Sequence, residues 1–173
     1  QQEQFQNAIC QRADRRPLQY ILGRWDFMGL PLKTGEGVLV PREETELLVH
    51  TAARFLEKTE KPQVLDLCAG TGAVGLGLAS LRQDAEILCV EWMPEAFSYL
   101  EANIAEFGNH HVRAKKANVL QSPAGFSKVD AILSNPPYVT DQEMQELQEE
   151  VKREPATALS GGADGLRFYR ALV

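Results

Sequence analysis

The chain has 173 residues, of which 44% are hydrophobic and 24% charged, and its formal net charge is -6 at pH 7. This is ordinary globular composition with enough apolar residues for a sizeable core, in one domain or one domain plus a small appendage. An acidic surface repels phosphate backbones, so generic nucleic-acid binding is disfavoured, although a local basic groove is compatible with this charge.

Membrane insertion and a disulfide framework are disfavoured as well. No apolar window approaches the length of a membrane span, and no signal peptide is visible. The cysteines are odd in number, and their spacing fits no zinc pattern: Cys10, Cys68 and Cys89. We expect reduced thiols in a cytoplasmic protein that binds no metal.

The first forty residues predict a helix and then a hairpin. Residues 1–15 are polar with two apolar side chains four positions apart, as in the end of a helix. Residues 17–41 carry turn-forming residues that favour two short β segments joined as a hairpin: Gly23, Gly29 and Pro31. Gln1 is not an initiator methionine, and the chain stops inside a helical pattern, so we expect a fragment of a longer protein.

From residue 42 onwards the predicted helices and strands alternate. A helix with acidic residues in its first turn is predicted at 42–58. Strands are then predicted at 63–67, 86–91, 111–117 and 129–134, and helices at 72–81 and 94–107. This order indicates an α/β fold, with a doubly wound, mostly parallel sheet and helices on both faces. Ligands of such sheets lie beyond the carboxyl ends of the strands, which are Leu67, Val90 and Ser134.

A glycine loop follows the first of these strands. Gly70, Gly72 and Gly75 match G-x-G-x-x-G, and Glu91 ends the next strand. The fingerprint alone does not identify a cofactor, and a helix-capping turn is the structural alternative. Asp66 lies at the mouth of the loop, where a carboxylate would repel a pyrophosphate. S-adenosylmethionine is cationic and has no phosphate, so the pattern favours it over NAD.

Two more residues are candidates for holding this cofactor. Glu91 is expected to accept hydrogen bonds from the ribose hydroxyls. Asn118 follows the third strand, where its side chain can bind the adenine amine while Val119 packs on the ring. An asparagine in a loop is more often only a turn residue.

The tetrapeptide Asn135-Pro136-Pro137-Tyr138 follows the last predicted strand, at the same sheet edge as the glycine loop. An amide or aryl amine nitrogen is a poor nucleophile because its lone pair is delocalised. The Asn135 side-chain oxygen and the Pro136 carbonyl are suited to accept its two N–H groups, and Pro137 offers no competing donor. Tyr138 can stack on a planar group. The structural alternative is a proline turn.

Three further segments make a family resemblance specific. They are Pro17–Leu32, Val38–Val49 with its Pro-Arg-x-x-Thr-Glu pattern, and Glu154–Leu172. Together with the tetrapeptide they resemble the PrmC/HemK family of peptide chain release factor glutamine methyltransferases. The resemblance covers most of the chain from Pro17 onwards.

The resemblance implies a truncated class I, Rossmann-like methyltransferase. Residues 42–173 would be the methyltransferase domain without its C-terminal strands, 17–41 a linker with a β-hairpin, and 1–16 the remnant of an N-terminal helical domain. The reaction would move a methyl group from S-adenosylmethionine to the glutamine amide of the Gly-Gly-Gln motif in a release factor. This implies a protein partner and no direct contact with nucleic acid or membrane.

The resemblance also assigns residues. The cofactor would contact Asp66, Cys68, Ala69, Gly70, Thr71, Gly72, Glu91, Asn118, Val119 and Asn135. Asn135, Pro136 and Tyr138 would be catalytic, and the glutamine would contact Asn135, Pro136, Pro137, Tyr138, Arg42 and Glu46. The chain departs from the family at Cys68-Ala69, which replace a pair such as Gly-Thr, and at Glu91 and Asn118, which each replace an aspartate.

Other interpretations stay open at this point. Arg42, Thr45 and Glu46 also fit ordinary helix capping and a solvated charge. We expect residues 143–154 to form a solvated helix face. A methyltransferase for an exocyclic amine of a nucleic-acid base would share the tetrapeptide and the loop, but should carry a basic groove. A non-catalytic NAD-type binding module would give Asn135 no role.

Overall fold

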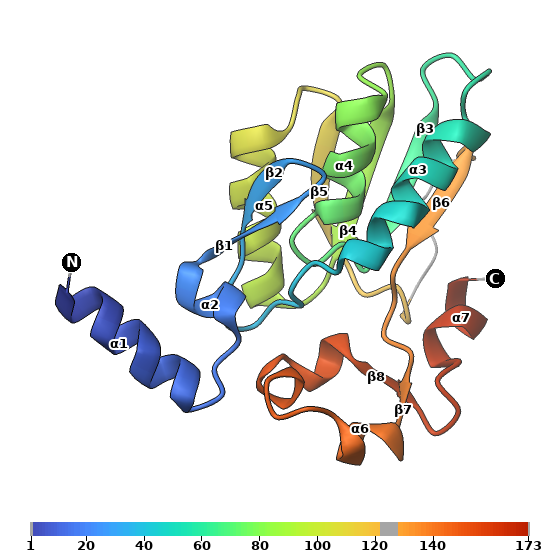
Figure 1. Ribbon diagram of the computed structural model, residues 1–173. Coiled ribbons are helices and arrows are strands. Elements are labelled where there is room, and N and C mark those ends of the chain that lie inside the picture. The colour runs from blue at the N-terminus through green and yellow to red at the C-terminus, as the bar shows by residue number, and fades with distance from the viewer. Residues whose placement is uncertain (1, 122–127, 173) are drawn as a thin grey trace.

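A four-stranded parallel sheet organises the chain (Figure 1). The computed structural model describes residues 2–121 and 128–172. In spatial order the strands are β5 (Val112–Lys116), β4 (Glu86–Glu91), β3 (Gln63–Leu67) and β6 (Ala131–Ser134). The chain begins in the middle at β3, moves outward to β5 and then crosses to the other side of β3. This reversal between β3 and β6 is the switch point at which open α/β sheets bind ligands.

Helices lie on both faces of the sheet, as predicted, but unequally. One face carries α3 (Glu46–Phe55), α4 (Ala73–Leu81) and α5 (Pro94–Phe107), and these helices contribute side chains to one core with the strands: Val49, Leu76, Leu100, Val64 and Ile87. The other face packs Leu65, Leu67 and Val90 against Phe168 of α7 (Arg167–Leu172).

The predicted bounds agree with the structure where the apolar pattern is strong. The strands at 63–67 and 86–91 and the helix at 94–107 begin and end as predicted. The strands predicted at 111–117 and 129–134 are shorter, and the helix predicted at 42–58 begins as the 3-10 turn η1 (Glu43–Thr45) and ends at Phe55. Pro94 stands in the first turn of α5, where its missing N–H leaves no helical bond unmade.

The N-terminal segment contains the predicted helix and hairpin. Helix α1 (Gln2–Ala13) projects from the body of the molecule and buries none of its described side chains (Figure 1). A short helix α2 (Leu18–Leu22), which the sequence did not predict, leads into the antiparallel strands β1 (Arg24–Phe27) and β2 (Leu30–Lys33). Residues 34–42 then cross the edge of the sheet to η1 without regular structure.

A small lobe lies below the sheet in Figure 1. It consists of β7 (Val139–Thr140), α6 (Glu143–Glu146), the 3-10 turns η2 (Val151–Arg153) and η3 (Ala156–Ala158), and β8 (Ser160–Gly162). The solvated helix predicted at 143–154 is wrong, because α6 ends at Glu146 and Glu154 is buried with 5% exposure. A charged sequence is compatible with an exposed helix or with a buried side chain. Glu154 is buried because it has a partner elsewhere in the fold.

Residues 2–121 and 128–172 contain neither a membrane-spanning helix nor a metal-binding cluster. None of their helices combines the length and the apolar character that a membrane crossing requires. Their histidine, cysteine, aspartate and glutamate side chains do not form a group of three or more that could hold a metal ion.

Candidate active site

The glycine loop between β3 and α4 forms part of a pocket of about 800 Å³. We call it the inner pocket; it is lined by Asp66, Cys68, Gly70, Thr71, Glu91 and Asn135, among others. Cys68, Gly70 and Gly72 have φ angles of 61°, 56° and 84°, so the chain turns tightly before α4 begins. A side chain at Gly72 would also place its Cβ 2.7 Å from Leu100. The tight loop thus brings backbone N–H groups to the pocket wall.

Asp66 lies beneath this loop and is 1% exposed. Its Oδ2 accepts a hydrogen bond from the Gly75 backbone N–H at 2.9 Å, in the first turn of α4. Burial is the main cause that raises the pKa of Asp66 to about 7, and the nearby Glu91 raises it further. The carboxyl group therefore stabilises the glycine loop. A positive charge in the inner pocket would favour its ionised form.

Asp66 should make the protein less stable as the pH rises. The folded-state pKa of about 7 lies above the ordinary 3.8, so its contribution to stability is complete below pH 4 and is lost as the pH rises towards 7. Asp66→Asn keeps an acceptor for Gly75 but does not titrate. Between pH 5 and pH 8 the wild type should lose about 2 kcal/mol, or roughly 4–8 °C in Tm, relative to this variant.

Thermal melts at the two pH values measure this difference. Asp84→Asn is the control, since Arg82 holds the pKa of Asp84 at about 2 and its titration lies outside this range. Equal pH dependence in the wild type and Asp66→Asn would contradict the assignment.

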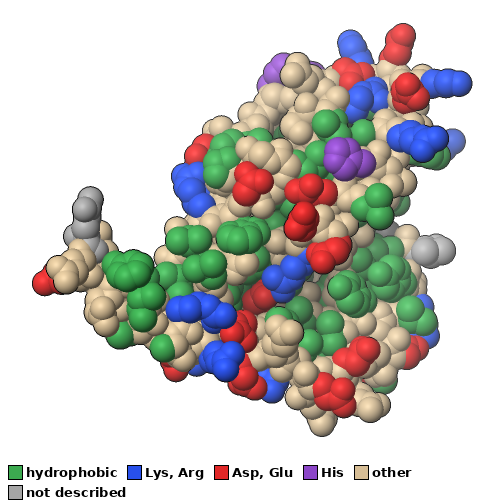
Figure 2. Space-filling model, in the orientation of Figure 1, with side chains coloured by type: hydrophobic (Ala, Val, Ile, Leu, Met, Phe, Trp, Pro, Cys, Tyr) green, Lys and Arg blue, Asp and Glu red, His purple; other side chains and the backbone are tan. Residues whose placement is uncertain are grey.

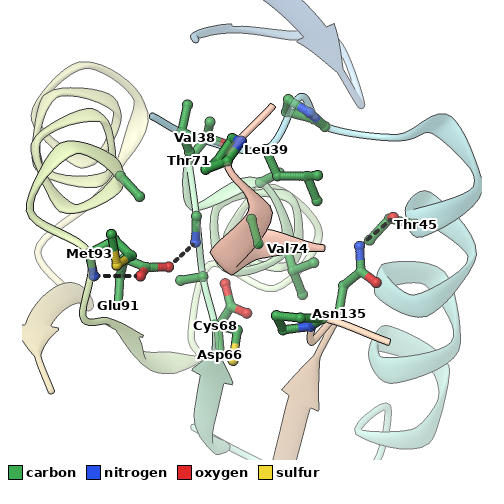
Figure 3. A pocket seen from close by; sticks show the side chains of 18 of the residues that line it. Val38, Leu39, Thr45, Asp66, Cys68, Thr71, Val74, Glu91, Met93 and Asn135 are labelled. Atoms are coloured by element: carbon green, nitrogen blue, oxygen red, sulfur yellow. Dashed lines mark hydrogen bonds between the residues drawn. The ribbon is translucent and has the colours of Figure 1, made fainter. Parts of the chain in front are cut away.

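Glu91 joins two loops at the end of β4 (Figure 3). Its Oε2 accepts a hydrogen bond from Gly70 N at 3.0 Å, and its Oε1 accepts from Trp92 N at 2.7 Å and Met93 N at 2.9 Å. A carboxylate has about four acceptor positions, so one is left for a hydroxyl in the pocket. Trp92 and Met93 also line the pocket. Sequence reasoning missed both, although they directly follow the acidic residue at the strand end.

Cys68 lines the inner pocket and does not act as a nucleophile. Burial, followed by the charge of Glu91, raises the pKa of its thiol to about 12. The group therefore stays protonated at neutral pH, and its sulfur offers an apolar, polarizable surface.

Asn135 stands where the inner pocket meets a second, larger hollow of about 1430 Å³. We call this second hollow the outer groove; its lining includes Arg42, Asn135, Pro136, Tyr138, Glu143 and Leu147. Asn135 Nδ2 donates a hydrogen bond to Thr45 Oγ1 at 3.3 Å (Figure 3). Among the described residues, no donor lies within hydrogen-bonding distance of Asn135 Oδ1. This oxygen is also not one of the buried side-chain atoms that lack a partner in that part of the chain. The side-chain oxygen is thus available to a ligand.

The rest of the tetrapeptide divides between the two cavities. Pro137 lines the inner pocket, whereas Pro136 and the 58% exposed Tyr138 line the outer groove. A later segment binds the backbone next to the tetrapeptide, because Val139 N donates a hydrogen bond to Leu159 O at 2.8 Å. A side chain at Gly161 would place its Cβ 2.8 Å from Tyr138 Cα, so only glycine allows this close approach.

Arg42 and Glu46 are tied to other parts of the chain. Arg42 lines both cavities, but its guanidinium donates to the buried Glu154, which also accepts from Val40 N at 2.9 Å. Glu46 lies outside the lining of both, and its Oε1 accepts from Met28 N at 2.9 Å. Their substrate contacts stay a prediction, whereas their structural contacts are present.

Three predicted cofactor residues do not line the inner pocket. Asn118 closes a turn, because its Oδ1 accepts from Leu120 N at 2.9 Å. Val119 packs into the core on the α7 face of the sheet. Gly72 is the N-cap residue that precedes α4, and it too is not among the lining residues described. The contacts that these residues were predicted to make with a cofactor stay a prediction.

Asn103 is a residue of the site that the sequence did not reveal. It is fully buried on α5, and its Nδ2 donates to Thr71 O at 2.9 Å and to Lys33 O at 3.0 Å. Its Oδ1 accepts from Lys33 N at 2.8 Å. One amide thereby fixes the glycine loop to the hairpin. The only available signal was an asparagine on the apolar face of a predicted helix.

The charges of the inner pocket limit its ligands. Its described lining includes the carboxyl groups of Asp66 and Glu91 and one basic group, Arg42, which Glu154 neutralises. Figure 2 shows further acidic side chains in the middle of the visible face, near the start of α3. Such surroundings repel phosphate groups and favour a ligand that is cationic or apolar.

Comparisons with known proteins identify relatives of this chain. A family profile described as "Conserved hypothetical protein 95" matches residues 48–161. A release factor glutamine methyltransferase of Clostridium acetobutylicum is 36% identical over 174 residues, which are 99% of this chain and 61% of that protein. One of Geobacter sulfurreducens is 39% identical over 166 residues, which are 95% of this chain and 57% of that protein. The chain thus spans about three fifths of the length of these curated relatives.

A solved structure shares the fold. The hMettl16 catalytic domain in complex with MAT2A 3'UTR hairpin 6 superposes with a TM-score of 0.67 at 19% identity, over 89% of this chain and 58% of that one. The predicted class I, Rossmann-like architecture is therefore confirmed.

Proposed function

Because the chain belongs to the Conserved hypothetical protein 95 family and is related over nearly its whole length to release factor glutamine methyltransferases, we propose that it methylates a glutamine side chain. The methyl donor is S-adenosylmethionine, and the acceptor is the amide nitrogen of the glutamine in the Gly-Gly-Gln motif of a peptide chain release factor. The observation that carries this proposal is the position of Asn135, whose free Oδ1 lies where the inner pocket meets the outer groove.

The inner pocket fits S-adenosylmethionine in the charge of its lining. Its described lining offers carboxyl groups and no uncompensated base. Residues 68–71 supply backbone groups, Glu91 has an acceptor position left for a ribose hydroxyl, and Trp92 and Met93 supply apolar surface. When bound, S-adenosylmethionine supplies a methyl group on a positively charged sulfur, which becomes a neutral thioether when the carbon–sulfur bond breaks.

The protein's own part in the reaction is to position the acceptor nitrogen. Asn135 Oδ1 and the Pro136 carbonyl accept its two N–H groups and favour a tetrahedral nitrogen with an available lone pair. Pro136 and Pro137 each have a fixed φ, which holds the Pro136 carbonyl rigidly. Tyr138 gives the planar carboxamide a surface to stack on. The nitrogen forms its new bond to carbon and then releases a proton to water, so no strong general base is required.

The nucleic-acid alternative uses the same tetrapeptide on an exocyclic base amine. It requires a basic path for the phosphate backbone, whereas Arg42, the basic residue in the described lining of both cavities, is paired with Glu154. A purely NAD-binding module is disfavoured by the two carboxyl groups in the inner pocket.

Labelled S-adenosylmethionine distinguishes these functions. The protein is incubated in parallel with a release factor, with the same factor carrying alanine in place of the motif glutamine, and with duplex DNA and structured RNA. We expect label in the first sample alone. Label in either nucleic acid, or equal labelling of the two release factors, would contradict the proposed substrate.

A further inference from the structure

The hydroxyl of Thr45 is bonded to the tetrapeptide and not to the first turn of α3. Thr45 is the last residue of η1 and directly precedes α3; its φ and ψ angles of -71° and -17° are helical, and its side chain makes no capping hydrogen bond. A threonine that caps a helix has non-helical angles, and its oxygen accepts an N–H from the first turn. Here the oxygen instead accepts from Asn135 Nδ2 at 3.3 Å, across 90 residues of sequence (Figure 3). The simple capping interpretation of Thr45 therefore does not hold.

We propose that Thr45 is the positioning residue for the Asn135 carboxamide. The proposal rests on the proposed function, because it concerns the acceptor oxygen used in methyl transfer. Both residues line the inner pocket, and the bond to Thr45 is the one hydrogen bond that the described structure gives the Asn135 side chain.

The contact matters because an asparagine side chain can rotate about its terminal bond. Rotation would move Oδ1 away from the substrate amide, or exchange it for an NH2 group that cannot accept an N–H. When Nδ2 is bound to Thr45, the opposite side of the amide group, which carries Oδ1, is left for the substrate. A hydroxyl can accept or donate, so Thr45 fixes the plane of the amide and stays paired while Oδ1 is in use.

The neighbours of Thr45 hold it in place on both sides. Arg42 is bound to the buried Glu154, and Glu46 accepts from the Met28 backbone N–H. The three polar residues of the Pro-Arg-x-x-Thr-Glu pattern thus contact three different segments. Arg42 contacts the small lobe, Thr45 contacts the tetrapeptide, and Glu46 contacts the hairpin. Because its segment is held in place on both sides, the Thr45 hydroxyl can fix the orientation of the Asn135 amide.

The first test replaces Thr45 by valine, which keeps the branched shape and removes the hydroxyl. Because no cap is lost, Tm should not change, whereas kcat should fall about tenfold with an unchanged KM for S-adenosylmethionine. Thr45→Ser should restore most of the rate. The control is Thr51→Val on the exposed side of the same helix, where the hydroxyl only donates to Leu47 O.

A double variant shows whether Thr45 acts through Asn135. In Asn135→Ala the amide is absent, so adding Thr45→Val should cause no further loss of rate. A further tenfold loss in the double variant would overturn the proposal, because Thr45 would then act by another route.

A second measurement does not depend on the substrate. The side-chain NH2 signals of Asn135 are assigned by their loss in Asn135→Asp, and their order is measured by ¹⁵N relaxation. Thr45→Val should make this group more mobile, and Thr51→Val should leave it unchanged. Unchanged order in Thr45→Val would refute the positioning role, whatever the substrate is. Increased mobility without any labelling of release factor would support the contact and reject the proposed function alone.

Discussion

Replacing Asn135 by alanine should lower kcat for methyl transfer by about 10²–10³-fold, the usual effect of removing one preorganised group at a reacting centre. The variant removes the acceptor that holds one N–H of the substrate amide, so the nitrogen lone pair stays delocalised. Asn135 contributes to the wall of the inner pocket but not to the glycine loop or to Glu91. The Kd for S-adenosylmethionine should therefore change by less than about threefold.

Single-turnover transfer of a labelled methyl group and calorimetric titration of the cofactor separate the two effects. Asn7→Ala is the matched control, since Asn7 is exposed on α1. Transfer at a near-normal rate in Asn135→Ala would show that the tetrapeptide is a structural turn and that the mechanism is wrong. A loss of cofactor binding equal to the loss of rate would assign Asn135 to the cofactor and not to the acceptor amide.

The largest loss of stability is expected from Glu154→Ala. This change removes the partner of Arg42 and leaves the Val40 N–H without its acceptor. Removing one member of a buried ion pair costs about 3–5 kcal/mol. The Arg42 side chain is 35% exposed and therefore partly screened by water, so we expect the lower value of about 2–3 kcal/mol in the free energy of unfolding.

Urea unfolding measures this change. Glu149→Ala is the control, because Glu149 pairs with Lys152 on the surface, where water screens the two charges, so this change should leave stability nearly unaltered. Glu154→Gln keeps an acceptor, so its loss in the free energy of unfolding should lie between the losses in Glu154→Ala and Glu149→Ala. A loss in Glu154→Ala no larger than that in the control would show that residues 38–42 do not depend on this contact. Because Arg42 lines both cavities, we also expect Glu154→Ala to weaken cofactor binding.

The sequence predicted those parts of the site that local rules determine. The strand β3, the glycine loop and Glu91 at the end of β4 follow from apolar runs, turn chemistry and the strand order, which are all readable within a few residues. Because parallel strands end at the same edge, the position of Asn135 beside this loop also followed. Asn118 and Val119 were predicted from their place after the third strand and from the family resemblance. In the fold Asn118 closes a turn and Val119 lies in the core, and their contacts with a cofactor stay a prediction.

Contacts between distant segments were decided by the tertiary structure alone. Glu154 belongs to a charged stretch that is typical of solvent exposure, and it is buried only because Arg42 and Val40 meet it from 112 and 114 residues away. Thr45 has the sequence of a helix cap, but the fold places Asn135 within reach of its hydroxyl. The backbone pattern of this protein is a local property, whereas the partner of a polar side chain depends on which segments the fold brings together.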